Sequence, residues 1–144
     1  MRLSDHFTLA ELCASQTAAR LGIDNTPPPD ILAELRETAA MMEQARRHLG
    51  NKGITVTSGY RCLAVNRAIG SGDSSAHVRG MAVDFICPSF GSPLEVARAL
   101  AQSDIAFDQL IHEFGAWVHI GRSPGLPRRM VLTIDGAGTR HGLE

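Results

Sequence analysis

The chain has 144 residues and a formal net charge of -1, with 14 Lys and Arg against 15 Asp and Glu. This length allows one domain whose core needs no disulfides, and the balanced charge disfavours nucleic acid or an anionic membrane as the main partner. No apolar stretch approaches the roughly 20 residues that span a bilayer, and residues 1–6 lack the apolar segment of a signal peptide. We therefore expect synthesis in the cytoplasm without a signal peptide, and no membrane insertion.

The first third of the chain carries helix signals. Thr8 stands three residues before Glu11, the spacing of a capping box, which predicts a short helix from residue 7 to about 15. The prolines at 27–29 restrict the backbone and predict an extended connection. Apolar residues then recur at helical spacing over 30–50, which predicts the longest helix of the chain.

The rest of the chain alternates between strand and helix patterns. Ser92, Pro93 and Glu95 occupy the cap, first and third positions of an expected helix, the best-marked one in the sequence. Runs rich in β-branched and apolar residues predict strands at 53–60, 81–86, 107–114, 117–121 and 130–134. Helices are expected at 63–68 and 92–101, and a loop at 70–75.

Together these elements predict an α+β fold, a small and mainly antiparallel sheet with helices packed on it. We expect one domain over 1–144, with a helical part at 1–50 and a sheet-rich part at 51–135. The cysteines Cys13, Cys62 and Cys87 are odd in number, widely spaced and never in a CxxC pair, so we expect free thiols rather than a disulfide framework or a metal motif.

Three residues in the strand-rich part suggest a catalytic zinc site. His77 precedes Asp84 by seven residues, and His119 follows in the strand at 117–121. Two imidazoles and one carboxylate leave the fourth tetrahedral position of Zn²⁺ open, as in catalytic rather than structural sites. Taken alone, Asp84 is equally compatible with a structural ion pair, and a structural role is the more common one for single histidines such as His77 and His119. Their joint occurrence predicts one bound Zn²⁺ and a hydrolase.

The sequence resembles the M15 zinc peptidases, the D-alanyl-D-alanine carboxypeptidase and phage-endolysin group that cuts peptidoglycan stem peptides. The likeness rests on these residues: Thr57-Ser58-Gly59-Tyr60-Arg61, Asn66, Gly70, Ser75-Ala76-His77, Gly80, Ala82, Asp84, Phe107-Asp108-Gln109 and Trp117-Val118-His119. The segment 7–27 is similar to the compact, phage-associated branch. The resemblance implies a fold shared with the hedgehog signalling domain, and zinc bound by His77, Asp84 and His119.

A zinc peptidase also needs a carboxylate that moves a proton from water to the leaving amine. Much of the family has an acid three residues before the last histidine, where this chain has Ala116. Glu113 is our candidate. A three-residue hairpin loop at 114–116 would place Glu113 on the face of His119, whereas a two-residue loop at 115–116 would place His112 there instead. We favour the first register.

Four residues are candidates for substrate binding. Arg61 can bind a peptide carboxylate with two parallel hydrogen bonds, although a surface arginine at a strand end is the alternative. Ser75 either contacts substrate or caps its loop. Gln109 lies on the same strand alternation as Glu113, although a sheet-edge amide is at least as consistent. Trp117 either stacks on substrate or packs in the core.

We expect a monomeric zinc-dependent peptidase, endolysin-like, acting on peptidoglycan stem peptides in the cell wall or periplasm after release, with a holin as a candidate partner for export. The sequence leaves open which stem-peptide bond is cut, and whether Co²⁺, Ni²⁺ or Cu²⁺ competes for the site. Two alternatives remain. One is a zinc-stabilised binding module without activity, and the other is a phage tail-associated wall peptidase.

Overall fold

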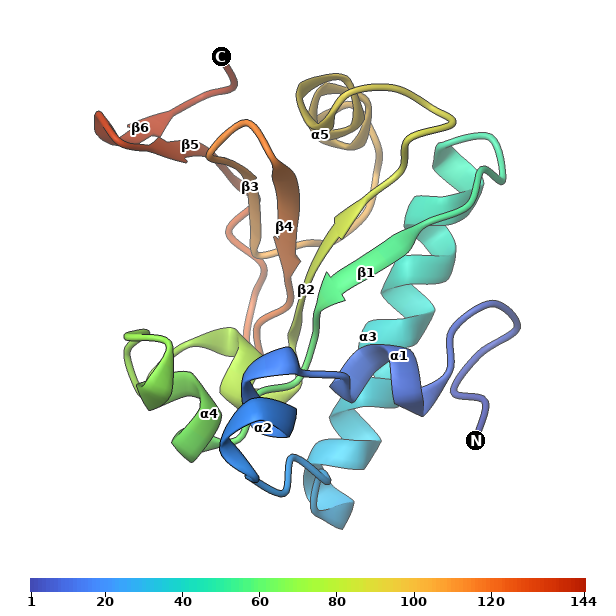
Figure 1. Ribbon diagram of the computed structural model, residues 1–144. Helices are drawn as coiled ribbons and strands as arrows, with labels where there is room; N and C mark the ends of the chain where they lie inside the picture. Colours follow the sequence, from blue (N-terminus) through green and yellow to red (C-terminus); the bar gives the residue numbers. More distant parts are fainter.

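The computed structural model describes all residues, 1–144, as a six-stranded sheet with associated helices (Figure 1). The helices are α1 (Leu9–Cys13), α2 (Gln16–Leu21), α3 (Pro29–His48), α4 (Leu63–Ala68), α5 (Pro93–Ala101) and the 3-10 helix η1 (Ala76–Arg79). The strands are β1 (Thr55–Ser58), β2 (Ala82–Ile86), β3 (Gln109–Glu113), β4 (Trp117–Gly121), β5 (Met130–Asp135) and β6 (Gly138–His141). Helices α3 and α5 pack in the core, and the shorter helices α1, α2 and α4 gather toward one end of the molecule (Figure 1). No helix combines the length and apolarity that crossing a membrane requires.

The sheet has the strand order β1-β2-β4-β3-β5-β6. Every neighbouring pair is antiparallel except β3 and β5, which run parallel. The predicted α+β fold with a mainly antiparallel sheet is therefore confirmed. Strands β3 and β5 are parallel because the chain passes the β3–β4 hairpin before β5 joins the outer side of β3. No local sequence signal predicts this pairing.

Capping boxes mark the starts of α1 and α5, as the sequence predicted. Thr8 Oγ1 accepts a hydrogen bond from the Glu11 amide at 3.2 Å, and a Glu11 carboxylate oxygen accepts one from the Thr8 amide at 3.1 Å. Ser92 and Glu95 form the same reciprocal capping box at the start of α5. Each box satisfies backbone N–H groups that the first helical turn leaves without partners.

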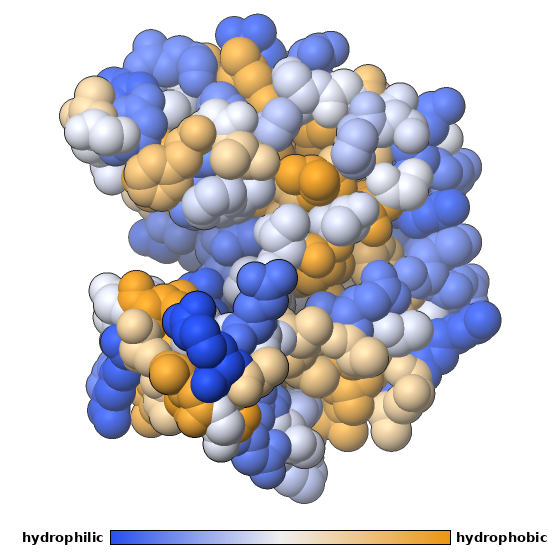
Figure 2. All heavy atoms as spheres, viewed as in Figure 1, coloured by the Kyte–Doolittle hydropathy of each residue, from blue (hydrophilic) through white to orange (hydrophobic).

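Strand alternation divides the sheet into two faces. Val83 and Phe85 are fully buried in the main apolar cluster, which also contains α3 and α5 residues such as Leu35 and Leu100. Side chains alternate along a strand, so Asp84 lies on the opposite face. On this side of the molecule, Figure 2 shows a notch in the surface between the region of β5 and β6 and the region of α4.

Three elements were not predicted, helix α2, the 3-10 helix η1 and strand β6. Helix α2 has a cap at each end: Ser15 Oγ accepts from the Ala18 amide at 3.0 Å, and Gly22 follows the helix with φ of 67°. Both are recognisable signals in the sequence. The helix has only six residues and buries only Ala18, so no apolar periodicity accompanies the caps.

Gly59 is where α1 and the end of β1 come closest. The Tyr60 amide donates to Leu12 O at 2.7 Å, and a Cβ added at Gly59 would lie 2.2 Å from that same oxygen. No flexible side chain can move aside there, because the obstructing atom belongs to the backbone. Only glycine therefore allows this contact.

We expect Gly59→Ala to lower the free energy of unfolding by about 2 kcal/mol or more, because one of the two segments must shift. Gly53→Ala is the control, since a Cβ at Gly53 meets nothing within 4 Å. Urea denaturation of both variants measures the difference. Equal midpoints for Gly59→Ala and wild type would show that the close approach does not constrain the fold.

Candidate metal centre and active site

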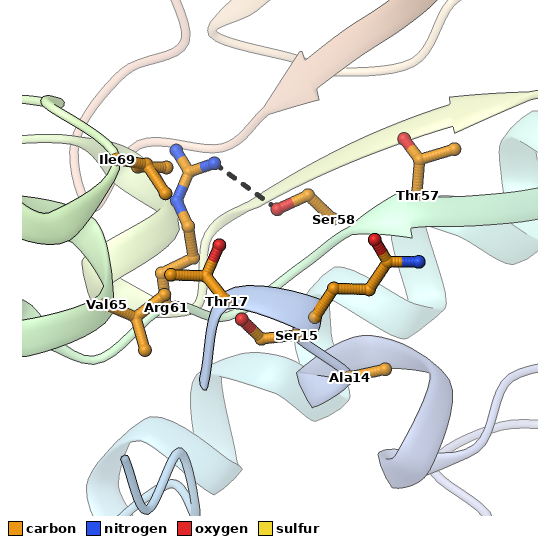
Figure 3. Close-up of a pocket in the computed structure, with 9 residues that line it drawn as sticks. Ala14, Ser15, Thr17, Thr57, Ser58, Arg61, Val65 and Ile69 are labelled. Carbon is orange, nitrogen blue, oxygen red and sulfur yellow. Dashed lines mark hydrogen bonds between the residues drawn. The ribbon is translucent and has the colours of Figure 1, made fainter. Parts of the chain in front are cut away.

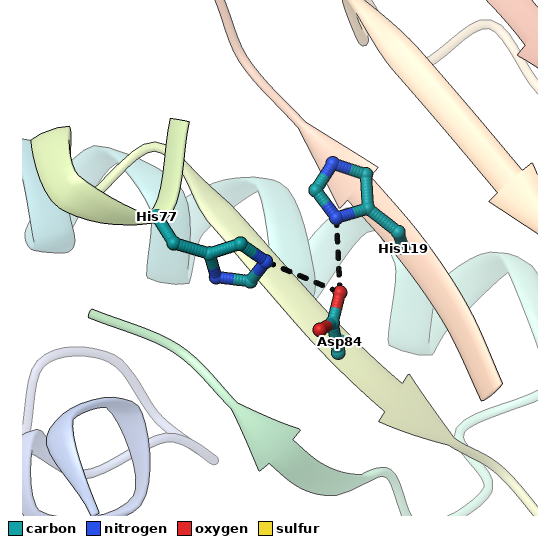
Figure 4. A group of neighbouring side chains, drawn as sticks. All are labelled: His77, Asp84 and His119. Carbon is teal, nitrogen blue, oxygen red and sulfur yellow. Dashed lines mark hydrogen bonds and ion pairs between the residues drawn. The ribbon is translucent and has the colours of Figure 1, made fainter. Parts of the chain in front are cut away.

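Three side chains from three different elements converge on the sheet face opposite the core (Figure 4). Asp84 on β2 pairs in register with His119 on β4, and η1, which immediately precedes β2, adds His77. All three residues are buried, and one ligand atom from each lies within 4.8 Å of the others. Asp84 Oδ1 is 2.9 Å from His119 Nδ1 and 3.3 Å from His77 Nε2.

The position of His77 is fixed by backbone contacts. Its Nδ1 lies 2.7 Å from Gly59 O, and its amide donates to Ser75 Oγ at 3.3 Å. Gly80 ends η1 with φ of 69°, and Gly80 O accepts from the buried Thr38 hydroxyl of α3 at 2.6 Å. Helix α3, β1 and η1 thus hold the ring in place together.

These contacts place two hydrogen-bond acceptors, His77 Nε2 and Asp84 Oδ1, opposite each other. Gly59 O can only accept, so His77 Nδ1 carries the proton of the neutral ring and Nε2 has a lone pair. Burial is the main cause that lowers the pKa of His77 and favours this neutral form. The lone pair of Nε2 then points at Asp84 Oδ1, and a cation between the two atoms removes their repulsion.

Asp84 is ionised in this setting. Burial by itself raises the pKa of the carboxyl, but the two neighbouring histidines, above all the hydrogen bond from His119, outweigh it and hold the pKa below its usual value. An anionic carboxylate and neutral imidazoles are the protonation states that bind metal. These donors fit Zn²⁺, and because the group contains three residues only, one tetrahedral position stays open.

Glu113 lies beside this group. The β3–β4 register pairs Glu113 with Trp117 and Ile111 with His119, which confirms the three-residue loop at 114–116. The carboxylate is 3.9 Å from His119 Nδ1. His112 instead points away, with its Nδ1 3.0 Å from Glu144 O.

The surroundings of Glu113 raise the pKa of its carboxyl. Burial is the largest cause, and the negative charge of Asp84 adds to it. His119, Arg61 and the Trp117 indole N–H act in the opposite direction and only partly offset the rise. A carboxyl whose pKa is moved toward neutrality can both accept and return a proton.

Arg61 faces a cavity of about 180 Å³ next to the metal centre (Figure 3). Its Nε donates to Asn66 Oδ1 at 3.2 Å and its Nη1 to Ser58 Oγ at 3.3 Å. No carboxylate lies within ion-pair distance of this half-buried guanidinium, and burial lowers its pKa. The cavity is lined by Ala14, Ser15, Gln16, Thr17, Thr57, Ser58, Arg61, Val65 and Ile69, with no acidic residue among them.

The other predicted substrate residues differ in where they lie. Ser75 caps η1 at the His77 amide. Gln109 pairs with Gly121 at the far end of β3, and its amide contacts Met130 Sδ at 4.0 Å rather than the metal group. Trp117 lies opposite Glu113, and its Nε1 is buried without a hydrogen bond.

Sequence reasoning missed two parts of the Arg61 environment. Gln16 and Thr17 belong to α2, which was not predicted, and both line the cavity. Asn66 is fully buried and holds Arg61 on one side, while its amide nitrogen donates to Gly72 O at 2.8 Å on the other. Ser15 is a usable signal for α2, but nothing local reveals the contact between Asn66 and Arg61.

A family model described as Peptidase M15 matches residues 5–121, a range that contains the His77, Asp84 and His119 group and Glu113. The chain belongs to the M15 peptidase family. A comparison with curated proteins found no match. As an M15 peptidase the protein is a hydrolase of the metallopeptidase type, and its buried His-Asp-His group is a possible metal site. The cysteines are free, as the sequence predicted.

We expect His77→Ala, Asp84→Ala and His119→Ala each to lose bound zinc, because each removes one of three donors. Metal content after dialysis, measured by plasma mass spectrometry, reports the stoichiometry. His141→Ala, an exposed histidine on β6, is the control and keeps the wild-type value. Retention of one equivalent of zinc by any of the three variants would remove that residue from the ligand set.

Proposed function

We propose that this M15 peptidase is a zinc-dependent enzyme that hydrolyses peptide bonds in peptidoglycan stem peptides. The observation that carries the proposal is the arrangement of His77 Nε2 and Asp84 Oδ1, two acceptors 3.3 Å apart that need a cation between them. His119 supplies a third donor, and Glu113 supplies a carboxylate at the same place. A metal site that only stabilised the fold would not need the Glu113 carboxylate beside the three donors.

His77, Asp84 and His119 would hold one zinc ion. When bound, zinc acts as a Lewis acid and lowers the pKa of water. Glu113 takes a proton from the attacking water and passes it to the nitrogen of the leaving amine. Burial and the Asp84 charge raise the pKa of Glu113, which makes the second transfer easier.

Arg61 is the proposed anchor for the substrate. A half-buried cation without an acidic partner favours binding of an anion, and the guanidinium has five N–H donors of which two are used by Asn66 and Ser58. Stem peptides present carboxylates of this kind. Ser75, Gln109 and Trp117 complete the proposed substrate-binding set, although the first two also have structural contacts.

We propose further that residues 1–144 work as one zinc peptidase domain and as a monomer. The proposed role is endolysin-like, on the cell wall after release from the cytoplasm, with a holin as export partner. A phage tail-associated wall peptidase would use the same chemistry. The second class of function is a zinc-stabilised binding module, which Ala116 favours, whereas the position of Glu113 favours the hydrolase.

Zinc-loaded protein incubated with isolated sacculi tests the activity, with released muropeptides identified by mass spectrometry. We expect Glu113→Gln to keep zinc and to lower kcat by about 100-fold or more, because the amide cannot accept the proton. Glu37→Gln, at an exposed glutamate of α3, is the matched control with wild-type kcat. No released muropeptide from wild type would instead favour the binding module.

Thr17→Glu tests the anchor, because it places a carboxylate in the cavity that Arg61 faces. We expect KM to rise about 10-fold for a stem peptide with a free terminal carboxylate, with little change in kcat. The same peptide with a terminal carboxamide should show no such rise. Thr139→Glu, on exposed β6, is the control. An unchanged KM for the free acid would rule out Arg61 as the carboxylate site.

A further inference from the structure

Phe114, at the tip of the β3–β4 hairpin, is unfavourable by two local criteria. Its φ angle is 54°, in the left-handed region where glycine or asparagine is expected and a bulky side chain is strained. Its side chain is also 55% exposed. The next residue, Gly115, has a φ of 66° and follows the usual preference. Neither the backbone nor burial accounts for a phenylalanine here.

The structure nonetheless holds the Phe114 ring in one place. The Phe114 amide donates to Ile134 O at 2.7 Å, which ties the hairpin tip to β5, and the Ala116 amide donates to Glu113 O at 3.0 Å. The ring packs against Trp117, with centroids 5.6 Å apart and planes at 46°. An exposed aromatic ring is thus fixed by its backbone and by a second aromatic ring.

This aromatic pair lies next to the proposed proton carrier. Phe114 follows Glu113 directly in the chain, and Trp117 is the cross-strand partner of Glu113. Trp117 contacts the Phe114 ring and also pairs across the strands with Glu113, and its indole N–H is buried without a hydrogen bond of good geometry. The exposed face of the pair therefore borders the active site.

We infer that Phe114 and Trp117 form an apolar ledge that binds an uncharged, apolar part of the substrate beside the scissile bond, and that Phe114 is a specificity-determining residue. The inference rests on the proposed peptidase function. Residues in unfavourable backbone conformations persist where function requires them, and covering an exposed ring with an alkyl group of the substrate is favourable. Arg61 differs from this ledge in its chemistry, because it offers the substrate a charged contact instead of an apolar one.

Phe114→Asn separates this role from stability, because asparagine suits a positive φ and removes the ring. We expect an equal or higher melting temperature, unchanged zinc content, and an affinity for a synthetic alanine-containing stem peptide at least 10-fold weaker by calorimetry. KM should rise by a similar factor while kcat changes little. Phe114→Tyr, which keeps the ring, should restore affinity to within about twofold of wild type.

Phe90→Asn is the matched control, an exposed phenylalanine in the turn before α5, and should bind the peptide like wild type. Wild-type affinity in Phe114→Asn with intact cleavage would overturn the ledge alone. A 10-fold affinity difference without cleavage by wild type would support the ledge and overturn the proposed hydrolysis. A peptide that wild type neither binds nor cleaves would contradict both.

Discussion

The site depends on one electrostatic constraint, the lone pair of His77 Nε2 facing the carboxylate of Asp84 at 3.3 Å. Burying a carboxylate is costly unless an opposite charge or a hydrogen bond compensates it. The Gly59 carbonyl keeps the proton of His77 on Nδ1, so His77 Nε2 has no proton to donate to Asp84. A divalent cation between the two atoms would resolve the conflict, and His119 would complete the donor set. The close packing of Leu12 on Gly59 and the capped η1 helix maintain this geometry.

The surroundings of the metal group differ in chemistry from one side to the other. The cavity beside Arg61 is lined mainly by hydroxyl and amide side chains with one cation and three apolar residues, and the hairpin tip presents the aromatic rings of Phe114 and Trp117. Glu113 lies on the same hairpin as the rings. Under the proposed function, a peptide with a carboxylate at one position and an apolar group at another would fit both sides and would have a defined direction across the His77, Asp84 and His119 group.

Much of this arrangement could be predicted from the sequence because its signals are local. Capping residues such as Ser92 marked helix ends, and the alternation around Asp84 placed it away from the core. The hairpin sequence left two registers open, and the one that turns Glu113 inward was favoured because the proposed chemistry needs a carboxylate there. Helix α2, the 3-10 helix η1 and strand β6 were missed because none of them has an apolar period, and the cavity that Arg61 lines is visible only once α2 is in place. The strained φ of Phe114 likewise has no sequence signal.

The most direct test of the metal site is a crystal structure of the zinc-loaded protein with anomalous diffraction measured on both sides of the zinc absorption edge. The arrangement of side chains predicts a single anomalous peak bound by His77 Nε2, Asp84 and His119 Nδ1, with the fourth position open to solvent and Glu113 nearby but not bound. A peak elsewhere, or an ion enclosed by a fourth protein donor, would contradict the catalytic site.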